Sequence, residues 1–237
     1  MGSPNMHIKS VVKTSLIDFP NRLASIVFVG GCNFRCPFCQ NAELVLRPGE
    51  LPDLPVEEVL ASLRERRGFV DGLVISGGEP TLEAGLFDFA REVTALGLAI
   101  KLDTNGYRPD ALGRLLEAGL LEFVAMDIKA APDRYAEAAG LPALRLERIR
   151  ESLDLLRASP CAHELRTTVV PGLVAVEDAD ALAELVHGAQ RYVLQQYRPD
   201  RALVPALQDV TPYTVRELEE LAARLNARGV PTTIRGV

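Results

Sequence analysis

Three of the four cysteines of this chain lie in one short stretch, GGCNFRCPFCQNAEL at residues 30–44, as Cys32, Cys36 and Cys39. Their spacing is C-x3-C-x2-C, and no other cysteine or histidine stands near enough in the sequence to complete a tetrahedral metal site. Thiolates select zinc, copper(I) or iron–sulfur clusters, and a structural zinc site needs four protein ligands. Three thiolates instead suit a cubane cluster whose fourth iron stays open to another ligand.

Two other interpretations of the cysteines stay open at this point. One is a zinc knuckle that borrows His163 or Cys161 from a distant strand, and the other is a chance cluster without a metal. Cys161 stands alone in ASPCAHEL and is expected to be a buried or half-buried thiol. A disulfide framework is not expected, because three of only four cysteines are clustered in a chain of 237 residues.

The composition argues against two classes of partner. The chain has 26 basic and 32 acidic residues, which gives no electrostatic footprint for nucleic acid or an anionic membrane. No apolar run reaches the about 18 residues of a spanning helix, and the start, MGSPNMHIKS, lacks the apolar core of a signal peptide. We therefore expect a cytoplasmic protein without nucleic-acid or membrane partners.

Apolar, β-branched runs alternate with amphipathic helical patterns along the chain. The predicted strands are 23–30, 72–78, 98–106, 121–129, 163–172 and 191–197. The predicted helices are 55–68, 82–97, 108–119, 145–159, 177–190 and a last one that begins with a Thr214–Glu217 capping box and ends at Gly229.

Six strand–helix units in series predict a parallel sheet with right-handed crossovers. Because a closed barrel needs eight such units, we expect an α/β fold, an open, partial parallel β/α barrel of about six units. The 48% share of apolar residues is enough for a full core, so we expect a single domain at 8–237. Residues 1–7 are expected to be a tag remnant and a disordered N-terminus.

The predicted strands end in glycines or in polar residues that could act as ligands. The first predicted strand ends in the cysteine loop, which holds Cys32, Cys36 and Cys39. The other five end in SGGEP, DTNG, MDIKA, VVPG and QQYRP. Parallel α/β folds build their ligand sites at the carboxyl edge of the sheet, so we expect these segments to line one cavity.

Two of these strand ends have a physical rationale of their own. Gly77 and Gly78 allow the backbone to approach a ligand closely, although an ordinary turn that begins at Glu79 is the alternative. Asp127 and Lys129 are two residues apart on a predicted strand, so their side chains share a face. There the charges need a bound ligand or each other as partners.

The motifs together carry a resemblance to a known family. C-x3-C-x2-C with Phe38 before the last cysteine, followed by the Gly77-Gly78-Glu79-Pro80 motif, resembles the radical S-adenosylmethionine (SAM) superfamily. From Ile8 to Pro199 the chain is more narrowly similar to the activating proteins of anaerobic ribonucleotide reductase, and more distantly to pyruvate formate-lyase activating enzyme. Most such activases have histidine where this chain has Gln40.

The resemblance implies a [4Fe–4S] cluster on the three cysteines and SAM bound to its open iron. It implies that SAM is cleaved to methionine and a 5′-deoxyadenosyl radical, which removes a hydrogen from a glycine of a partner enzyme. The expected partner is a glycyl radical enzyme, first of all anaerobic (class III) ribonucleotide reductase. The expected electron donor is a flavodoxin or a ferredoxin.

The resemblance also implies a set of site residues. Lys129 would meet the SAM carboxylate, and Arg166 would lie beside the ribose and the carboxylate of SAM. The backbone of Thr168 would lie near the adenine, and Gln196 would stand near the place of a histidine in some activases. The full expected SAM set is Phe38, Gly77, Gly78, Glu79, Asp103, Thr104, Lys129, Arg166, Thr168 and Gln196.

A monovalent cation, Na⁺ or K⁺, is implied at two of the strand ends. Its ligands would be the Asp103 carboxylate, Thr104, the Ala125 carbonyl and the Asp127 carboxylate. The alternative is that Asp103 caps the turn that follows it and Asp127 pairs with Lys129.

Two rival functions remain on the sequence alone. One is a radical SAM enzyme that acts on a small molecule or a peptide, although the chain has no further cysteine cluster to hold an auxiliary cluster. The other is a non-enzymatic zinc or electron-transfer module. Iron and sulfide analysis separates this module from the enzymes, because a cubane cluster gives about four irons per chain.

Exchange of the cysteines for alanine tests the cluster assignment. Cys32→Ala, Cys36→Ala and Cys39→Ala should each abolish cluster assembly and SAM cleavage, because a thiolate ligand has no substitute in the loop. Cys161→Ala is the matched control and should leave both nearly intact. The measurements are iron content after anaerobic reconstitution and 5′-deoxyadenosine yield. Full cleavage activity in any of the three loop variants would refute the assignment.

Overall fold

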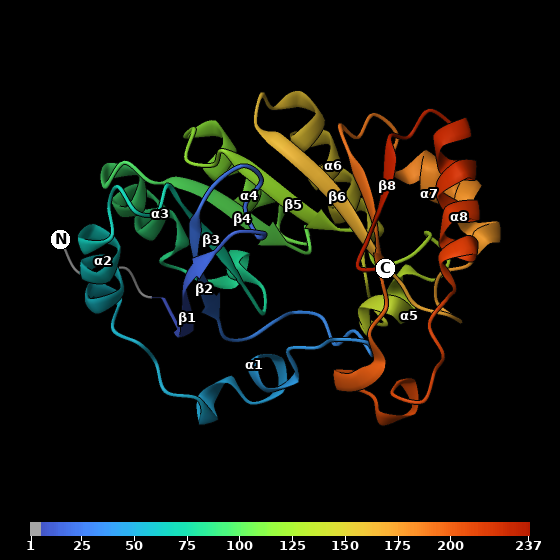
Figure 1. The fold of residues 1–237 in the computed structure, drawn as a ribbon, viewed down its shortest axis with the longest axis horizontal. Helices are drawn as coiled ribbons and strands as arrows, with labels where there is room; N and C mark the ends of the chain where they lie inside the picture. Colours follow the sequence, from blue (N-terminus) through green and yellow to red (C-terminus); the bar gives the residue numbers. More distant parts are fainter. Residues whose placement is uncertain (1–5) are drawn as a thin grey trace. The chain divides into compact units, whose positions relative to one another are not determined.

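The computed structural model describes residues 6–237, and in that part of the chain eight strands form one sheet. The strands are β1 (Ile8–Ser15), β2 (Ala24–Val29), β3 (Gly72–Gly77), β4 (Ala99–Thr104), β5 (Phe123–Asp127), β6 (Ala162–Val169), β7 (Tyr192–Gln196) and β8 (Thr232–Arg235). Their order in the sheet is their order in the chain (Figure 1). The sheet is therefore open, with β1 and β8 as its edges.

The strand directions confirm the predicted α/β fold. The neighbours β2/β3, β3/β4, β6/β7 and β7/β8 are parallel, and β1 alone is shown to run antiparallel, to β2. The six predicted strands are β2 to β7. The two edge strands were not predicted, because β1 is mostly exposed or half-buried and β8 has four residues, none of them buried. An edge strand with one face exposed to solvent lacks the apolar run of a central parallel strand.

The helices follow the strands in the predicted alternation. They are α1 (Ala42–Leu46), α2 (Val56–Glu65), α3 (Leu86–Ala95), α4 (Pro109–Glu117), α5 (Tyr135–Ala139), α6 (Leu146–Ala158), α7 (Ala179–Leu185) and α8 (Val215–Ala227). The six predicted helices are α2, α3, α4, α6, α7 and α8. The helices α1 and α5 have five residues each, which is too short for a periodic pattern to show.

The chain of this α/β domain divides into two compact units. The first comprises the chain up to Asn33 together with Glu43–Thr104 and Arg108–Val124, and the second comprises Phe34–Ala42, Asn105–Tyr107 and Ala125–Val237. The first unit holds β1 to β4, and the second holds β6 to β8. The division falls inside β5 and inside the cysteine loop.

One face of the sheet in the first unit changes character along its strands. Side chains on one face of β2 to β5 pack with Phe19 into an apolar cluster. The buried members are Phe19, Ala24, Ile26 and Val74, and the half-buried residues Phe28, Ala99 and Phe123 pack against them. On β4, Lys101 and Asp103 continue the face of Ala99, since side chains two apart point the same way. The apolar part therefore gives way to charged residues toward the carboxyl end of β4.

The first residues of the described chain belong to this unit. Met6 is buried, and the His7 amide donates a hydrogen bond to the Glu83 carboxylate at 2.9 Å. Met6 and His7 were expected in a disordered N-terminus, and that expectation is corrected for them. Residues 1–5 of the expected tag remnant lie outside the described residues.

In the second unit, α8 packs against α7, β7 and β8 (Figure 1). Leu218, Leu221 and Leu225 are its buried face, as the sequence predicts. The predicted capping box is confirmed, because the Glu217 amide donates to the Thr214 hydroxyl and the Glu217 carboxylate accepts from the Thr214 amide at 2.7 Å.

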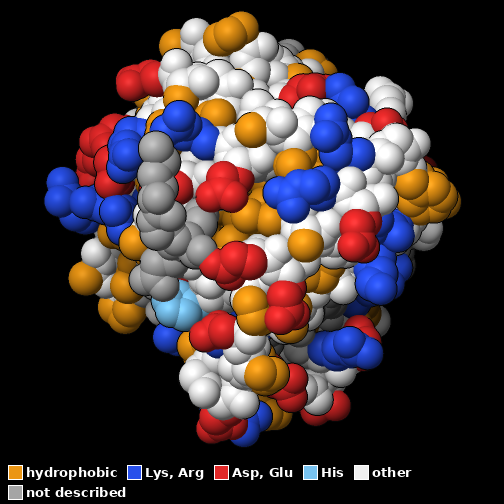
Figure 2. All heavy atoms as spheres, turned by 90° about the vertical axis from the view of Figure 1, so that its left-hand side faces the viewer, with side chains coloured by type: hydrophobic (Ala, Val, Ile, Leu, Met, Phe, Trp, Pro, Cys, Tyr) orange, Lys and Arg blue, Asp and Glu red, His pale blue; other side chains and the backbone are white. Residues whose placement is uncertain are grey.

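Two surface properties bear on possible partners. Among the described residues, no helix has the length and apolar character needed to cross a membrane. The side of the molecule on which α2 and α3 lie shows acidic, basic and apolar side chains intermixed (Figure 2). No single sign of charge covers this face.

Removal of the cap tests the last helix. Thr214→Ala should lower the free energy of unfolding by about 1 kcal/mol, because the Glu217 amide loses its acceptor. Thr214→Ser should retain most of the stability, since it keeps the hydroxyl. Thr211→Ala, at an exposed position outside the helix, is the control. Urea unfolding followed by circular dichroism gives the comparison, and equal midpoints for Thr214→Ala and Thr211→Ala would contradict the capping role.

Candidate active site

The cysteine loop is the segment between β2 and α1, and it contains no helix or strand. A turn at its end is closed by a hydrogen bond from the Cys39 amide to the Cys36 carbonyl at 3.0 Å. None of the three cysteines is bonded in a disulfide; Cys36 is buried, and Cys32 and Cys39 are half-buried. Burial raises the pKa of the Cys36 thiol, against the opposing effect of the nearby Lys129 charge. A metal would have to displace that proton, and Lys129 favours the resulting thiolate.

The two glycines after β3 pack against the residues that lead into the cysteine loop. Gly77 has a φ of +120°, and a Cβ on Gly78 would lie 1.8 Å from the Gly31 carbonyl oxygen. The Glu79 amide donates to that same oxygen at 2.8 Å. Glycine is therefore required here by the chain's own backbone, and the expected contact of Gly77 and Gly78 with SAM stays a prediction.

Glu79 is a buried carboxylate with structural partners. Its Oε1 accepts hydrogen bonds from the Thr81 amide at 3.1 Å and from the Thr104 hydroxyl at 2.7 Å. It thereby caps the short 3₁₀ turn Pro80–Leu82, which is the alternative that the sequence left open. The same contacts join the end of β4 to the turn after β3. A role of Glu79 and Thr104 toward SAM or a cation stays a prediction.

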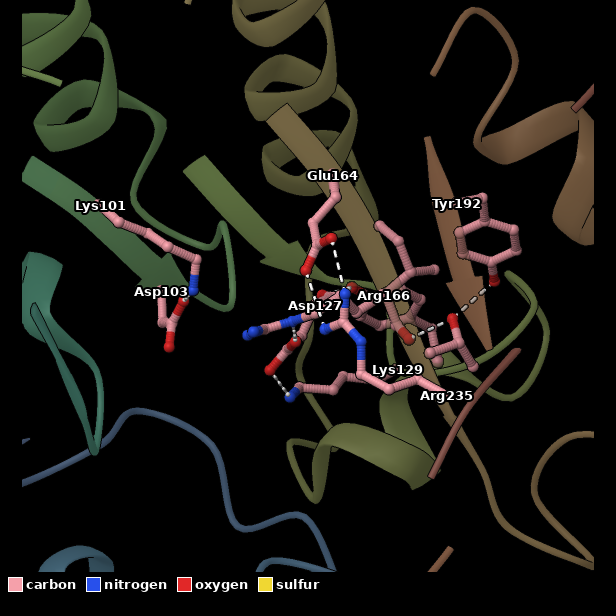
Figure 3. A network of polar contacts seen from close by, with 11 residues as sticks. Lys101, Asp103, Asp127, Lys129, Glu164, Arg166, Tyr192 and Arg235 are labelled. Atoms are coloured by element: carbon pink, nitrogen blue, oxygen red, sulfur yellow. Dashed lines mark hydrogen bonds and ion pairs between the residues drawn. The ribbon is translucent and has the colours of Figure 1, made fainter. Parts of the chain in front are cut away.

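Asp127 at the end of β5 lies between two cations (Figure 3). Its carboxylate accepts a hydrogen bond from the Lys129 ammonium at 3.0 Å and from the Arg166 guanidinium at 2.9 Å. β5 ends at Asp127, so Lys129 reaches the predicted pair from beyond the strand. The three side chains form a half-buried group with a net charge of +1, which suits an anionic ligand.

The charges in this group hold one another ionised. Burial favours the neutral form of Asp127, but the Arg166 and Lys129 charges outweigh it and hold its pKa at about 2. Burial likewise disfavours the charged form of Lys129, but the Asp127 carboxylate outweighs it and raises the Lys129 pKa. Lys129 therefore stays cationic throughout the physiological range of pH.

The Asp103 carboxylate pairs with a lysine side chain of the same strand. Lys101, whose side chain is 4% exposed, forms an ion pair with Asp103 two residues along β4 (Figure 3). Asp127, as described, pairs with Lys129 and Arg166. A cation was expected from the resemblance and from the repulsion between two carboxylates at neighbouring strand ends, and these ion pairs give each carboxylate a cationic side chain as partner. The Na⁺ or K⁺ site with Thr104 and the Ala125 carbonyl stays a prediction.

The register of β6 and β7 places Gln195 and Gln196 on opposite faces of the sheet. Thr168 pairs with Gln195, and Thr168 shares its face of β6 with Arg166. Gln196 therefore lies on the opposite face, and its side-chain amide donates to the Tyr213 carbonyl at 2.7 Å. The structure thus brings Gln195, and not Gln196, to the face of Arg166 and Thr168. Contact of either glutamine with SAM stays a prediction.

Three further residues near this group were missed from the sequence. Tyr135 of α5 is fully buried, with its hydroxyl 3.4 Å from the Asp127 carbonyl, and burial raises its pKa. Glu164 of β6, with a side chain 2% exposed, accepts two hydrogen bonds from Arg235 of β8, at 3.0 and 3.1 Å (Figure 3). The available signal was the alternation of Glu164 with Arg166 on β6. Arg235 could not be found, because its strand was not predicted.

The residues proposed for a zinc knuckle do not share the face of Arg166. His163 is three residues before Arg166 on β6 and so points to the other face of the strand. Its ring nitrogen Nδ1 lies 3.3 Å from the carbonyl of Cys161, a residue that is buried as expected. Both therefore have local, structural surroundings.

The family of the chain follows from comparison with known proteins. The family model described as "Radical SAM superfamily" matches residues 26–186. The match includes the cysteine loop, the Gly77–Gly78 turn and the Asp127 group. The chain belongs to the radical SAM superfamily, and it is an enzyme of that superfamily.

Two relatives are named as activating enzymes, and a solved structure shares the fold. A protein of Methanocaldococcus jannaschii named "Putative glycyl-radical enzyme activating enzyme MJ1227" is 32% identical over 218 residues, which cover 90% of this chain and 89% of the relative. The pyruvate formate-lyase-activating enzyme of Clostridium pasteurianum is 30% identical over 131 residues, and the match spans 53% of each protein. The crystal structure of QueE from Escherichia coli has a TM-score of 0.58 at 15% identity, covers 98% of this chain and 94% of QueE, and supports the fold alone.

The superfamily implies a [4Fe–4S] cluster and SAM, and the described residues fit both. Cys32, Cys36 and Cys39 are thiols within eight residues that form no disulfide, a soft donor set suited to iron–sulfur chemistry. Lys129 and Arg166 offer charge-assisted donors for the SAM carboxylate.

A methyl group on Gly78 tests the close approach of the two backbones. Gly78→Ala should lower the free energy of unfolding by about 1–3 kcal/mol, because the new Cβ overlaps the Gly31 carbonyl. It should also lower iron content, since Gly31 precedes Cys32. Gly49→Ala is the control, because a Cβ there meets nothing within 4 Å. Urea unfolding and iron analysis give the answer, and equal results for the two variants would contradict the steric argument.

Proposed function

We propose that this protein is a glycyl-radical enzyme activating enzyme whose partner is anaerobic (class III) ribonucleotide reductase. The observation that carries the proposal is the 32% identity, over 90% of this chain, to the Methanocaldococcus jannaschii relative whose name states that activity. The partner is proposed from the segments around the cysteine loop, the Gly77–Gly78 turn and the end of β7 that resemble activating proteins of this reductase.

The chemistry is divided between the cofactors and the chain. When bound and reduced, the [4Fe–4S] cluster supplies the electron that cleaves SAM to methionine and a 5′-deoxyadenosyl radical, and this radical takes the α-hydrogen of a glycine in the partner. A flavodoxin or ferredoxin would supply the electron to the cluster.

The chain binds and orients SAM through the strand ends. Lys129 and Arg166 hold its carboxylate, and Asp127 fixes both cations, so that neither side chain has to be ordered when SAM binds. The backbone of Thr168 would lie beside the adenine, and Gln195 is on the same face of the sheet as Thr168. The Gly77–Gly78 turn offers backbone groups to the amino-acid end of SAM.

The proposal is tested in two steps with the reconstituted enzyme. With dithionite, the enzyme alone should convert SAM to 5′-deoxyadenosine slowly, because bond cleavage rests on the cofactors. With purified anaerobic ribonucleotide reductase, it should then produce the electron paramagnetic resonance (EPR) doublet of a glycyl radical. A reductase in which the radical glycine is replaced by alanine is the matched control.

The two steps separate the proposal from its rivals. Failure to form 5′-deoxyadenosine with a reducible cluster in place would overturn the enzymatic assignment. Cleavage of SAM without a glycyl radical on the reductase, but with one on pyruvate formate-lyase, would keep the activase and change the partner. Cleavage without a radical on either protein would favour an enzyme that acts on a small molecule or a peptide.

A further inference from the structure

Helix α6 holds the loop that follows β4. The Ser152 hydroxyl donates to the Gly106 carbonyl at 2.6 Å, and the Arg148 guanidinium donates to the Tyr107 carbonyl at 3.4 Å. The Arg145 amide at the start of the helix donates to the Tyr107 hydroxyl at 3.0 Å. Gly106 has a φ of +72°. Backbone and side chain of Tyr107 are therefore both fixed by α6.

The ring of Tyr107 contacts the cysteine loop. Its centroid lies 5.4 Å from that of Phe34, with an angle of 56° between the planes, in the range of a favourable tilted aromatic pair. The Arg148 guanidinium lies over the Tyr107 ring, 5.5 Å from its centroid. Phe34 is 1% exposed and stands between Cys32 and Cys36.

The residue after Phe34 is held by a second element. The Arg35 amide donates to the Ala139 carbonyl at the end of α5, at 2.9 Å. Gly140 follows with a φ of +59°, and a Cβ there would lie 2.1 Å from the Arg35 carbonyl oxygen. Two of the three residues between Cys32 and Cys36 are thus anchored by parts of the chain more than seventy residues away.

These contacts matter because the loop has no secondary structure of its own. Between β2 and α1, neither a helix nor a strand fixes the backbone, so the direction of each thiol depends on what the loop packs against. A cluster needs its thiolates in one fixed arrangement, and supporting contacts around the ligands supply it. The Phe34–Tyr107 contact is such a support.

We propose that Tyr107 is a positioning residue for the iron–sulfur cluster, which acts through the Phe34 ring to hold the Cys32–Cys36 segment in its ligating conformation. The inference rests on the cluster of the proposed function but is independent of the partner enzyme. The ring is the part that matters. The Tyr107 hydroxyl serves to fix the ring to α6.

The test compares three variants of the full chain after anaerobic reconstitution. Tyr107→Leu removes the ring, and Tyr107→Phe keeps it. Phe69→Leu is the matched control, because Phe69 is also a ring under an arginine, 4.9 Å from the Arg66 guanidinium, and is 58% exposed. The measurements are iron per chain, the EPR spectrum of the reduced cluster, the rate of cluster loss to a chelator, and thermal unfolding of the apo-protein.

We expect Tyr107→Leu to lose its cluster to the chelator about tenfold faster than wild type, in line with the effect of removing a support of a metal ligand. Its EPR spectrum should broaden and respond less to added SAM, whereas its apo-protein should still unfold cooperatively. Tyr107→Phe should restore both cluster properties. Phe69→Leu should match wild type.

The result that overturns the proposal is a Tyr107→Leu cluster with wild-type EPR and wild-type resistance to the chelator. Equal effects of Tyr107→Leu and Phe69→Leu would also overturn it, because they would indicate a general loss of stability. If the leucine variant fails to fold, Tyr107→Met, which keeps an apolar side chain of similar length, is measured in its place. None of these readouts involves the partner, so a failure of the proposed function to activate the reductase would leave them unaffected.

Discussion

A carboxylate that is removed from water on folding needs a compensating positive charge, and the carboxylates on the strands of this sheet each have one. Asp127 is held between Lys129 and Arg166, Asp103 by Lys101, and Glu164 by Arg235. Removal of a cationic partner would weaken this compensation, and an uncompensated buried charge costs far more than an ion pair gains. The side chains are therefore fixed before any ligand binds. The Asp127 group carries one more positive than negative charge, which suits an anionic ligand.

The cysteine loop depends on its surroundings in a different way. It has the ligand chemistry but no secondary structure, and its course is set by close backbone approaches and one aromatic contact. In the first unit, Gly78 packs on Gly31; in the second, Gly140 packs on Arg35 and Tyr107 on Phe34. At Gly78 and Gly140 a side chain would overlap the loop. The glycines around the loop are thus as much a part of the cluster site as the cysteines.

Much of the fold could be predicted because its patterns are local. Six of the strands contain apolar or β-branched runs, as central strands of a parallel sheet do, and six helices carry an apolar stripe or a capping box. The edge strands β1 and β8 have neither signal, because one side of an edge strand is open to solvent. Arg235 was missed for the same reason, although it is the partner of a buried carboxylate.

The same distinction between local patterns and long-range contacts decides which residues of the candidate site could be predicted. The three thiols follow from the sequence by themselves, because their spacing within eight residues is a local pattern. The pairing of Asp127 with Lys129 could also be predicted, since the two are only two positions apart in the sequence. By contrast, Arg166 meets Asp127 across 39 positions, and the face of Gln195 depends on the register between β6 and β7. Neither has a local pattern, because both are set by how strands pair, and strand pairing is decided only when the whole sheet forms.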